Sequence, residues 1–296
     1  MIWITGSSGM LGRETALAFD KYNLPYIASG SSIDITDYKS VTAFTAGKSI
    51  SYILNCAAYT AVDKAEDEIE KCEAVNSIGP ENIAKAASKI NAKLIHISTD
   101  YVFNGEKKTP YKETDAASAT GVYGRTKFEG ESNVLRVLPQ SWIIRTSWLY
   151  GAFGGNFVFT MLRLFNERDE IKVVNDQFGC PTWTGDLAEV ISVLIMRDKN
   201  KKSAPFGVYH FSNEGFCTWF EYAKKIYEYA VELNLTSKGC VIHPCTTLEY
   251  VTKAKRPKYS VLDKSKIKPA LGVDIPDWQF SLKKFLTEYK NGAYIK

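Results

Sequence analysis

The N-terminus constrains the fold most strongly, because a strand, a glycine loop and a helix follow one another there. Residues 2–5 form an apolar run, Gly6, Gly9 and Gly12 come next, and residues 13–20 carry apolar side chains at helical spacing. Glycines in such a loop let the backbone approach a pyrophosphate, and the helix directs its first N–H groups at the negative charge. The spacing is Gly-x-x-Gly-x-x-Gly, whereas the dinucleotide-binding fingerprint is Gly-x-Gly-x-x-Gly, so a plain turn is the alternative.

Strands and helices continue to alternate along the first half of the chain. Further apolar, strand-like runs lie at residues 25–29, 52–58, 93–98 and 141–146, with helical patterns between them. Short crossovers between such units favour a parallel sheet with helices on both faces. We therefore predict an α/β fold, a Rossmann-type doubly wound parallel sheet with a smaller C-terminal substrate-binding lobe.

The predicted division of the chain follows the point at which the elements become shorter and less regular. Residues 1–155 are expected to form an NAD(P)-binding domain, with part of residues 171–200 returning to it. Residues 156–296 are expected to form mainly the substrate-binding lobe. In this lobe, Thr218 and Glu221 make a capping box that opens an amphipathic helix.

Composition and charge argue against several classes of protein. The net charge of +4 over 296 residues is too small to indicate a nucleic-acid binder. No segment approaches the ~18 consecutive apolar residues that a membrane span needs. The N-terminus lacks the basic and apolar regions of a signal peptide, and the six cysteines form no Cys-x-x-Cys pair. Reduced thiols in a cytoplasmic protein are therefore expected.

Tyr123 and Lys127 are the main candidates for chemistry. They are four residues apart in a predicted helix, so they lie on the same face. A free phenol has a pKa of roughly 10, and a nearby ammonium lowers that pKa towards the working range. Such a pair gives a proton to a carbonyl oxygen or takes one from an alcohol. The alternative is an exposed helical turn that happens to carry both residues.

Two predicted strands end where a ligand is expected, because open α/β sheets bind ligands at the carboxyl ends of their strands. The run 52–58 ends in the small residues Ala57 and Ala58, which would let a cofactor lie against the backbone. Thr99 follows the run 93–98. Its hydroxyl would donate a hydrogen bond to a substrate carbonyl or cap a turn, and the sequence leaves both open.

The end of the predicted second strand bears on cofactor preference. An NAD-preferring site places an acidic residue there to hold the ribose 2′-hydroxyl. Residues 29–32 are instead Ser-Gly-Ser-Ser, which leaves room for a 2′-phosphate, although no arginine is present there to bind it. NADPH is the expected cofactor, with NADH possible, and Asp34 is placed to reach its adenine end.

The basic stretch at residues 253–258, Lys-Ala-Lys-Arg-Pro-Lys, is a candidate for binding a diphosphate. A solvated loop is the more common explanation for such a run of charges, and we prefer it at this stage.

Six stretches of sequence together resemble the extended short-chain dehydrogenase/reductases, and within them the dTDP-4-dehydrorhamnose reductase family, over nearly the whole chain. These stretches are residues 5–12, 55–66, 98–103, 122–127, 176–182 and 255–260. The resemblance implies NAD(P)H-dependent reduction of the 4-keto group of a nucleotide-linked deoxysugar, with dTDP-4-dehydro-L-rhamnose converted to dTDP-L-rhamnose. It also implies a homodimer.

The resemblance further implies roles for individual residues. Tyr123 would be the catalytic acid, Lys127 would hold the nicotinamide ribose and lower the tyrosine pKa, and Thr99 would bond the sugar carbonyl. The remaining implied cofactor contacts are Gly6, Gly9, Met10, Leu11, Gly12, Asp34, Ile35, Ala58, Tyr59 and Thr60, and the implied substrate contacts are Val62, Asp100, Tyr101 and Trp148.

Some members of the family bind a divalent metal at a dimer interface through glutamates. Glu14, Glu189 and Glu288 occupy similar places in this chain. We expect them to be surface glutamates on helices, so no metal is predicted.

Two other functions fit the same features. A sugar-nucleotide epimerase or dehydratase on this fold would recycle its cofactor and tend to retain it. A non-catalytic NADP-binding regulatory subunit, similar to the methionine adenosyltransferase β-subunit, would turn over no sugar and would co-purify with a catalytic partner. The intact set of Thr99, Tyr123 and Lys127 argues mildly against the regulatory subunit.

Overall fold

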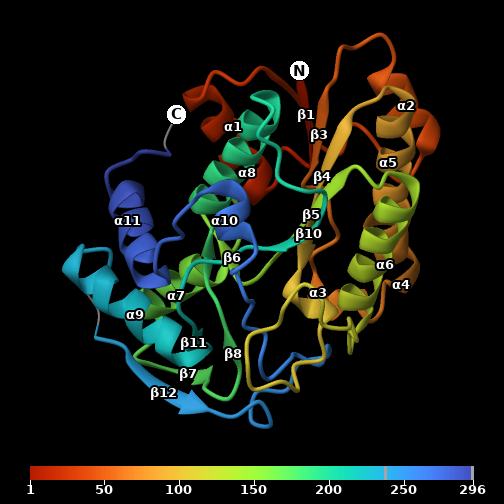
Figure 1. Ribbon diagram of the computed structural model, residues 1–296. Helices are drawn as coiled ribbons and strands as arrows, with labels where there is room; N and C mark the ends of the chain where they lie inside the picture. The colour runs from red at the N-terminus through yellow and green to blue at the C-terminus, as the bar shows by residue number, and fades with distance from the viewer. Residues whose placement is uncertain (237–238, 295–296) are drawn as a thin grey trace.

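The computed structural model describes residues 1–236 and 239–294, and a six-stranded sheet forms its centre (Figure 1). The strand order is β2-β1-β3-β4-β5-β10, and all neighbouring strands run parallel. The predicted doubly wound parallel sheet is therefore confirmed. The strands are β1 (Ile2–Thr5), β2 (Tyr26–Ser29), β3 (Tyr52–Asn55), β4 (Lys93–Thr99), β5 (Ser141–Thr146) and β10 (Gly207–His210).

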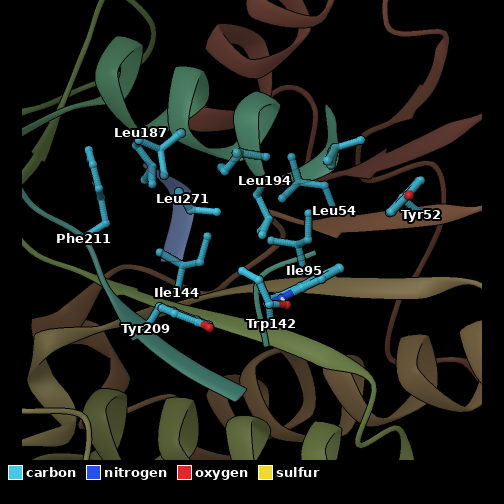
Figure 2. Packing of buried hydrophobic residues seen from close by; sticks show 14 of the residues in the cluster. Tyr52, Leu54, Ile95, Trp142, Ile144, Leu187, Leu194, Tyr209, Phe211 and Leu271 are labelled. Carbon is cyan, nitrogen blue, oxygen red and sulfur yellow. Dashed lines mark hydrogen bonds between the residues drawn. The ribbon is translucent and has the colours of Figure 1, made fainter. Parts of the chain in front are cut away.

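Helices cover both faces of this sheet, because successive strand side chains point to opposite faces. On one face, Leu54 and Ile144 pack in a cluster with Leu187 and Leu194 (Figure 2). On the other face, Trp3 belongs to a second cluster, which includes residues of the helices drawn at the right of Figure 1. The central strands are buried on both faces, which explains their almost continuous apolar sequences.

The helices that flank the sheet largely follow the sequence-based prediction. The sequence patterns predict helices at residues 63–73 and 75–90, and both differ in detail. Residues 63–73 contribute to two short helices, and between them the N–H groups of Asp67 and Glu68 both donate to the Lys64 carbonyl. The second helix opens with a π-helical turn. The elements are α1 (Met10–Lys21), α2 (Tyr38–Thr45), α3 (Val62–Ala65), α4 (Ile69–Glu73), the π-helix η1 (Ala74–Ile78), α5 (Gly79–Lys89), the 3-10 turn η2 (Asp100–Val102), α6 (Val122–Val137), α8 (Thr184–Lys199) and α10 (Ile267–Leu271).

In the described residues, the C-terminal lobe is built from short strand pairs and three helices. Its core combines aliphatic side chains with the aromatic side chains of Tyr150, Phe165, Tyr222, Trp278 and Phe285. The predicted capping box at the start of α9 is present. The lobe elements are β6 (Leu149–Tyr150), α7 (Phe157–Glu167), β7 (Glu170–Val174), β8 (Phe178–Gly179), β9 (Thr182–Trp183), β11 (Cys217–Thr218), α9 (Trp219–Glu232), β12 (Val241–Cys245) and α11 (Trp278–Lys290).

Parts of the C-terminal half pack on the main domain. Helix α8, which lies within residues 171–200, packs against α1, and α10 packs against α8. Strand β10 extends the main sheet beside β5, so the returning part of the chain reaches beyond residue 200.

Among the described residues, no helix is long and apolar enough to cross a membrane. All six cysteines are free thiols.

The topology sets where a ligand is expected. After β1 the chain adds β2 on one side, and then crosses to place β3 on the other side of β1. The crevice outside the carboxyl ends of the two strands at such a switch point is the usual binding site of a doubly wound sheet. The end of β1 carries the glycine loop, and the end of β3 carries the small residues at 57–58.

Candidate active site

A cavity of about 490 Å³ lies at the carboxyl ends of four strands of the main sheet. Gly6 follows β1, Cys56 follows β3, Thr99 ends β4 and Ser147 follows β5, and all four line the cavity. The predicted site residues on its wall are Gly6, Gly9, Met10, Leu11, Gly12, Ala58, Thr60, Val62, Thr99, Asp100, Tyr101, Tyr123, Lys127 and Trp148. The fold thus gathers groups from distant parts of the chain into one space.

The glycine loop forms one end of this cavity. Gly6 has φ +63°, a left-handed conformation, and a Cβ atom there would lie 2.6 Å from the backbone nitrogen of Ala57. The loop is therefore in close contact with the chain after β3. Gly9 caps α1 with no side-chain hydrogen bond, and the first turn of α1 holds no acidic residue. The first N–H groups of α1 are thus available, and this end of the cavity fits the diphosphate of a dinucleotide.

Helix α6 carries both Tyr123 and Lys127 into the cavity. Lys127 is only 2% exposed, and its Nζ donates to the Ile97 carbonyl of β4 at 2.6 Å. The Tyr123 ring meets the Tyr101 ring edge-on, with centroids 5.6 Å apart. The helix approaches this closely because residue 124 is glycine: a Cβ atom there would lie 2.0 Å from the Tyr101 carbonyl oxygen.

The expected lowering of the Tyr123 pKa is not observed. Burial raises the pKa of the Tyr123 phenol, a hydrogen bond with the Thr99 side chain opposes the rise, and the Asp100 carboxylate adds to it. Burial also lowers the pKa of Lys127 to about 8, against the attraction of the Glu131 carboxylate. Removal of the phenol from water is the largest of the effects on the Tyr123 pKa. Tyr123 therefore keeps its proton near neutral pH, which suits a proton donor.

Of the two roles that its position suggested, Thr99 fulfils the cap of a turn, and donation to a substrate carbonyl stays a prediction. Its Oγ1 accepts a hydrogen bond from the Tyr101 N–H at 3.2 Å and so caps the turn η2. The same hydroxyl donates to an Asp100 carboxylate oxygen at 3.1 Å, on the wall of the cavity. Asp100 is almost fully buried, and burial raises the pKa of its carboxyl group to about 6.

Trp148, immediately before β6, lines the cavity and packs against the core of the C-terminal lobe. Its ring stacks on Trp219 with centroids 3.5 Å apart and an angle of 10° between the ring planes. Its backbone has φ +45°, a conformation that a bulky residue adopts only when its surroundings impose it. Such strained residues are frequent at ligand sites. The stack on Trp219 and this backbone geometry together fix the indole on the wall of the cavity that Thr99 and Tyr123 also line.

Three predicted cofactor residues do not line this cavity. Asp34 is exposed and accepts hydrogen bonds from the Thr36 N–H and hydroxyl, and Ile35 is buried in the core. The Tyr59 backbone is held by Asn76, which accepts from the Tyr59 N–H at 2.8 Å and donates to the Tyr59 carbonyl at 3.0 Å. Their proposed place at the adenine end and middle of a cofactor stays a prediction.

Several cavity residues were missed by sequence reasoning. They are Cys56, Ile97, Ser98, Thr146, Ser147, Leu149, Gly154 and Gly155. Most of them sit at or just after the ends of β3, β4 and β5, so the rule that located Thr99 would also have found Thr146 and Ser147. Gly154 and Gly155 lie in the loop after β6, whose position depends on the tertiary fold.

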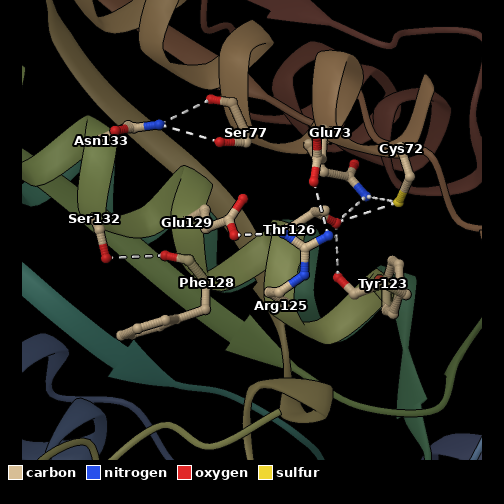
Figure 3. Close-up of polar contacts among 11 residues, drawn as sticks. Cys72, Glu73, Ser77, Tyr123, Arg125, Thr126, Phe128, Glu129, Ser132 and Asn133 are labelled. Carbon is tan, nitrogen blue, oxygen red and sulfur yellow. Dashed lines mark hydrogen bonds and ion pairs between the residues drawn. The ribbon is translucent and has the colours of Figure 1, made fainter. Parts of the chain in front are cut away.

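The start of α6 is anchored by polar contacts with α4 and η1 (Figure 3). The Thr126 hydroxyl donates to the Tyr123 carbonyl at 3.1 Å and lies 3.2 Å from the Cys72 sulfur. On the exposed side, Arg125 binds Glu73 and Glu129, each at 2.8 Å. These contacts hold the turn that presents Tyr123 to the cavity.

The basic stretch at 253–258 is only partly a solvated loop. Arg256 is half-buried and binds both carboxylate oxygens of Asp63, at 3.0 and 2.9 Å. Arg256 also lines a second cavity, of about 710 Å³, together with Lys255 and Lys258. The loop therefore ties the lobe to α3, immediately beside Val62 on the wall of the first cavity.

The expectation that all three family glutamates lie on the surface is wrong for Glu14. Glu14 is buried, and burial raises the pKa of its carboxyl group to about 7, with the Glu288 carboxylate adding to the effect. Glu189 binds Lys21, and Glu288 accepts from the Tyr294 hydroxyl at 2.8 Å. The three glutamates line one cavity of about 270 Å³ because α1, α8 and α11 converge there.

Comparisons with known proteins agree with this geometry. Residues 1–291 match the family described as RmlD substrate binding domain. A dTDP-4-dehydrorhamnose reductase of Aggregatibacter actinomycetemcomitans is 41% identical over 95% of this chain and 96% of its own length.

Two solved structures of proteins described as dTDP-4-dehydrorhamnose reductases share the fold. The protein from Clostridium acetobutylicum is 40% identical with a TM-score of 0.91, and the match covers 98% of this chain and 99% of that one. The protein from Bacillus anthracis, solved in complex with NADP, is 38% identical with a TM-score of 0.88, covering 97% and 98% of the two chains. The chain thus belongs to the dTDP-4-dehydrorhamnose reductase family.

Proposed function

We propose that the protein uses NADPH to reduce the 4-keto group of a nucleotide-linked deoxysugar, converting dTDP-4-dehydro-L-rhamnose to dTDP-L-rhamnose. The observation that carries the proposal is the presence of Thr99, Tyr123 and Lys127 on the wall of one cavity, next to a glycine loop that fits a diphosphate. The names of the relatives supply the substrate.

The three residues divide the chemistry between them. Tyr123, protonated at neutral pH, donates its proton to the oxygen of the reduced carbonyl. The Thr99 hydroxyl lies beside it and would hydrogen-bond that oxygen, which orients the carbonyl and stabilises the developing alkoxide. The Lys127 ammonium, fixed by Ile97, supplies positive charge next to the phenol. When bound, NADPH supplies the hydride.

The end of β2 supports NADPH over NADH. The buried Ser29 accepts a hydrogen bond from the Trp3 indole at 2.9 Å, and the next residues are small and uncharged. The nearest acidic side chain along the chain, Asp34, is engaged with Thr36. The carboxylate that an NAD site uses to bind the ribose 2′-hydroxyl is therefore not available there.

The test is nicotinamide absorbance after the pure protein is mixed with NADPH and dTDP-4-dehydro-L-rhamnose, with NADH in parallel. The proposal predicts rapid oxidation of NADPH, formation of dTDP-L-rhamnose and a slower rate with NADH. NADPH binding without oxidation would contradict the proposed substrate, and a catalytic partner that co-purifies with the protein would then indicate the regulatory-subunit alternative. Cofactor that stays bound through purification, with no net oxidation, would indicate an epimerase or dehydratase.

We also propose that the protein is a homodimer in the cytoplasm. The family resemblance supports the dimer, and six free thiols are compatible with a reducing compartment. Light scattering during size-exclusion chromatography tests the dimer, for which twice the chain mass of 33.1 kDa is expected.

A further inference from the structure

Glu131, one turn after Lys127 on α6, forms a buried ion pair with Arg145 that has no part in the mechanism above. Glu131 and Arg145 have side chains that are only 2% and 4% exposed. The Arg145 guanidinium binds the carboxylate through two nitrogens, Nε to Oε1 at 2.9 Å and Nη2 to Oε2 at 2.7 Å. A pair buried this deeply is weak support for stability, because removing both charges from water offsets most of their attraction. Its place in the fold therefore calls for another explanation.

The pair is connected to the active site through both α6 and β4. Tyr123, Lys127 and Glu131 follow one another at intervals of four residues, so they form a row along one face of α6. Three consecutive residues of β4 make hydrogen bonds with the side chains of this row. The Ile97 carbonyl accepts from Lys127, and the Ser98 hydroxyl donates to Glu131. The Thr99 side chain hydrogen-bonds Tyr123.

Arg145 completes the arrangement from the neighbouring strand. It sits on β5 directly opposite Ser98 in the strand register. Its guanidinium also lies over the Phe103 ring, 5.1 Å from the centroid. A lone carboxylate at position 131 would draw the Lys127 ammonium towards itself, one turn along the helix and away from Tyr123. Because Arg145 occupies both carboxylate oxygens, Lys127 is left to bind Ile97 at the cavity wall.

We propose that Glu131 and Arg145 are a positioning pair, which holds the Lys127 ammonium at the cavity and sets the electrostatic potential at the Lys127 ammonium and the Tyr123 phenol. The inference rests on the proposed function, since it assigns these residues to the same reaction. Neither residue touches the substrate; both act through Lys127.

The other groups that face Lys127 do not replace this pair. Cys56 after β3 and Cys72 of α4 are thiols, and burial raises the pKa of each, so both stay neutral. His96 of β4 is fully buried, and burial keeps the pKa of its imidazole well below the usual value, so it is neutral as well. Asp100 lies beyond Tyr123, beside Thr99. Glu131 is the charged side chain that the helix itself places next to Lys127, and it opposes the lowering of the Lys127 pKa by burial.

The test is the alkaline limb of the pH profile of kcat/KM, because removal of a charge moves the apparent pKa of every nearby group in a known direction. Glu131→Gln removes negative charge and is expected to shift the limb about one unit to lower pH. Arg145→Gln frees the carboxylate and is expected to shift it in the opposite direction. Ser98→Ala removes only the hydroxyl that donates to Glu131, and a smaller alkaline shift is expected.

Glu129→Gln is the matched control, because it makes the same charge change on α6 at an exposed position bound to Arg125. The alkaline limb of the kcat/KM profile of this variant is expected to stay at the wild-type pH. Activity that falls in Glu131→Gln, Arg145→Gln and Ser98→Ala with no displacement of the limb, or with all limbs displaced in one direction, would overturn the proposal in favour of a merely structural pair. If Glu131→Gln or Arg145→Gln does not fold, the other charge variant and Ser98→Ala still test the proposal, because the alkaline limb of each is expected to move in a defined direction.

A wild-type protein that binds NADPH but oxidises none would contradict the proposed function and leave the pair testable. The pH dependence of the NADPH dissociation constant then reports the charge on Lys127 directly. Opposite displacements of that profile in Glu131→Gln and Arg145→Gln would still support the positioning pair, and coincident profiles would overturn it.

Discussion

The two sides of the active-site cavity are built in different ways. On the sheet side, the groups are backbone amides and side chains at the ends of β1, β3 and β4, fixed by strand pairing and by the close contacts of Gly6 and Gly124. On the lobe side, Trp148 is held by aromatic stacking beside a core that includes tyrosine, tryptophan and phenylalanine. In the function proposed above, the sheet side would hold the cofactor and transfer the proton, and the lobe side would hold the sugar.

This difference predicts that substitutions on the two sides of the cavity will change different kinetic quantities. Changes on the sheet side are expected to lower turnover or NADPH affinity. Substitutions on the lobe side are expected to raise the KM for the sugar nucleotide and to leave turnover and NADPH affinity nearly unchanged.

The largest effect is expected for Tyr123→Phe on the sheet side. Loss of the proton donor is expected to lower kcat by about 10²–10⁴-fold, the usual contribution of a positioned acid. NADPH affinity, measured by fluorescence titration, is expected to stay within about twofold, because the glycine loop is untouched. Near-normal turnover in this variant would contradict the assignment of Tyr123.

Glu14→Gln tests the contact region between the main domain and the lobe, where residues of α1 and α11 line the same cavity. The folded-state pKa of Glu14, about 7, lies above its ordinary value of 4.5. The native state therefore binds more protons than the unfolded state between these pH values, and wild-type stability falls as pH rises through this window. The variant lacks this loss and is expected to be more stable at pH 8 by about 3 kcal/mol at most, with no difference near pH 4. Urea titrations at both pH values measure it, and equal gains at both would point to a cause other than titration.

Gly6→Ala should weaken cofactor binding on the sheet side. The added Cβ meets the Ala57 backbone, so the loop must shift, and NADPH affinity is expected to fall more than tenfold, or about 1.4 kcal/mol. Gly47→Ala is the matched control: Gly47 has φ +68°, and a Cβ atom there meets nothing within 4 Å. The control should lose a similar amount of stability, about 1 kcal/mol, and keep its NADPH affinity. Equal affinities in the two variants would exclude a special role for the Gly6 contact.

The smallest effect is expected for Trp219→Leu on the lobe side. Without its stacking partner, Trp148 loses about 0.5–1.5 kcal/mol of stacking free energy. If all of it is lost from substrate binding, the KM for the sugar nucleotide rises about 2–12-fold. Steady-state kinetics with saturating NADPH measure this change. A fall in kcat with unchanged KM would break the proposed division between the two sides.

The same contrast explains how much the sequence could predict. On the sheet side, strand periodicity, the glycine loop and the Tyr-Lys spacing pointed to Gly6, Thr99, Tyr123 and Lys127, and the structure brings all four to one cavity. The state of the Tyr123 proton was missed, because burial is a property of the assembled core. The burial of Glu14 was missed for the same reason: three helices far apart in sequence enclose it.

On the lobe side, prediction was weaker because its contacts are tertiary. Trp148 was placed by family resemblance alone, and neither its stack on Trp219 nor its positive φ has a local signal. The bidentate pair between Asp63 and Arg256 joins positions far apart in the chain, so the basic loop could not be located from its composition.

The most direct test of the central claim is the fate of the transferred hydrogen. The protein would be mixed with dTDP-4-dehydro-L-rhamnose and NADPH that carries deuterium at the transferable C4 position, and the product examined by mass spectrometry and NMR. The proposed reaction predicts one deuterium per molecule of dTDP-L-rhamnose, at sugar C4, with one NADPH consumed for each. A sugar product without deuterium, formed with no net loss of NADPH, would contradict a reductase and indicate an enzyme that recycles its cofactor.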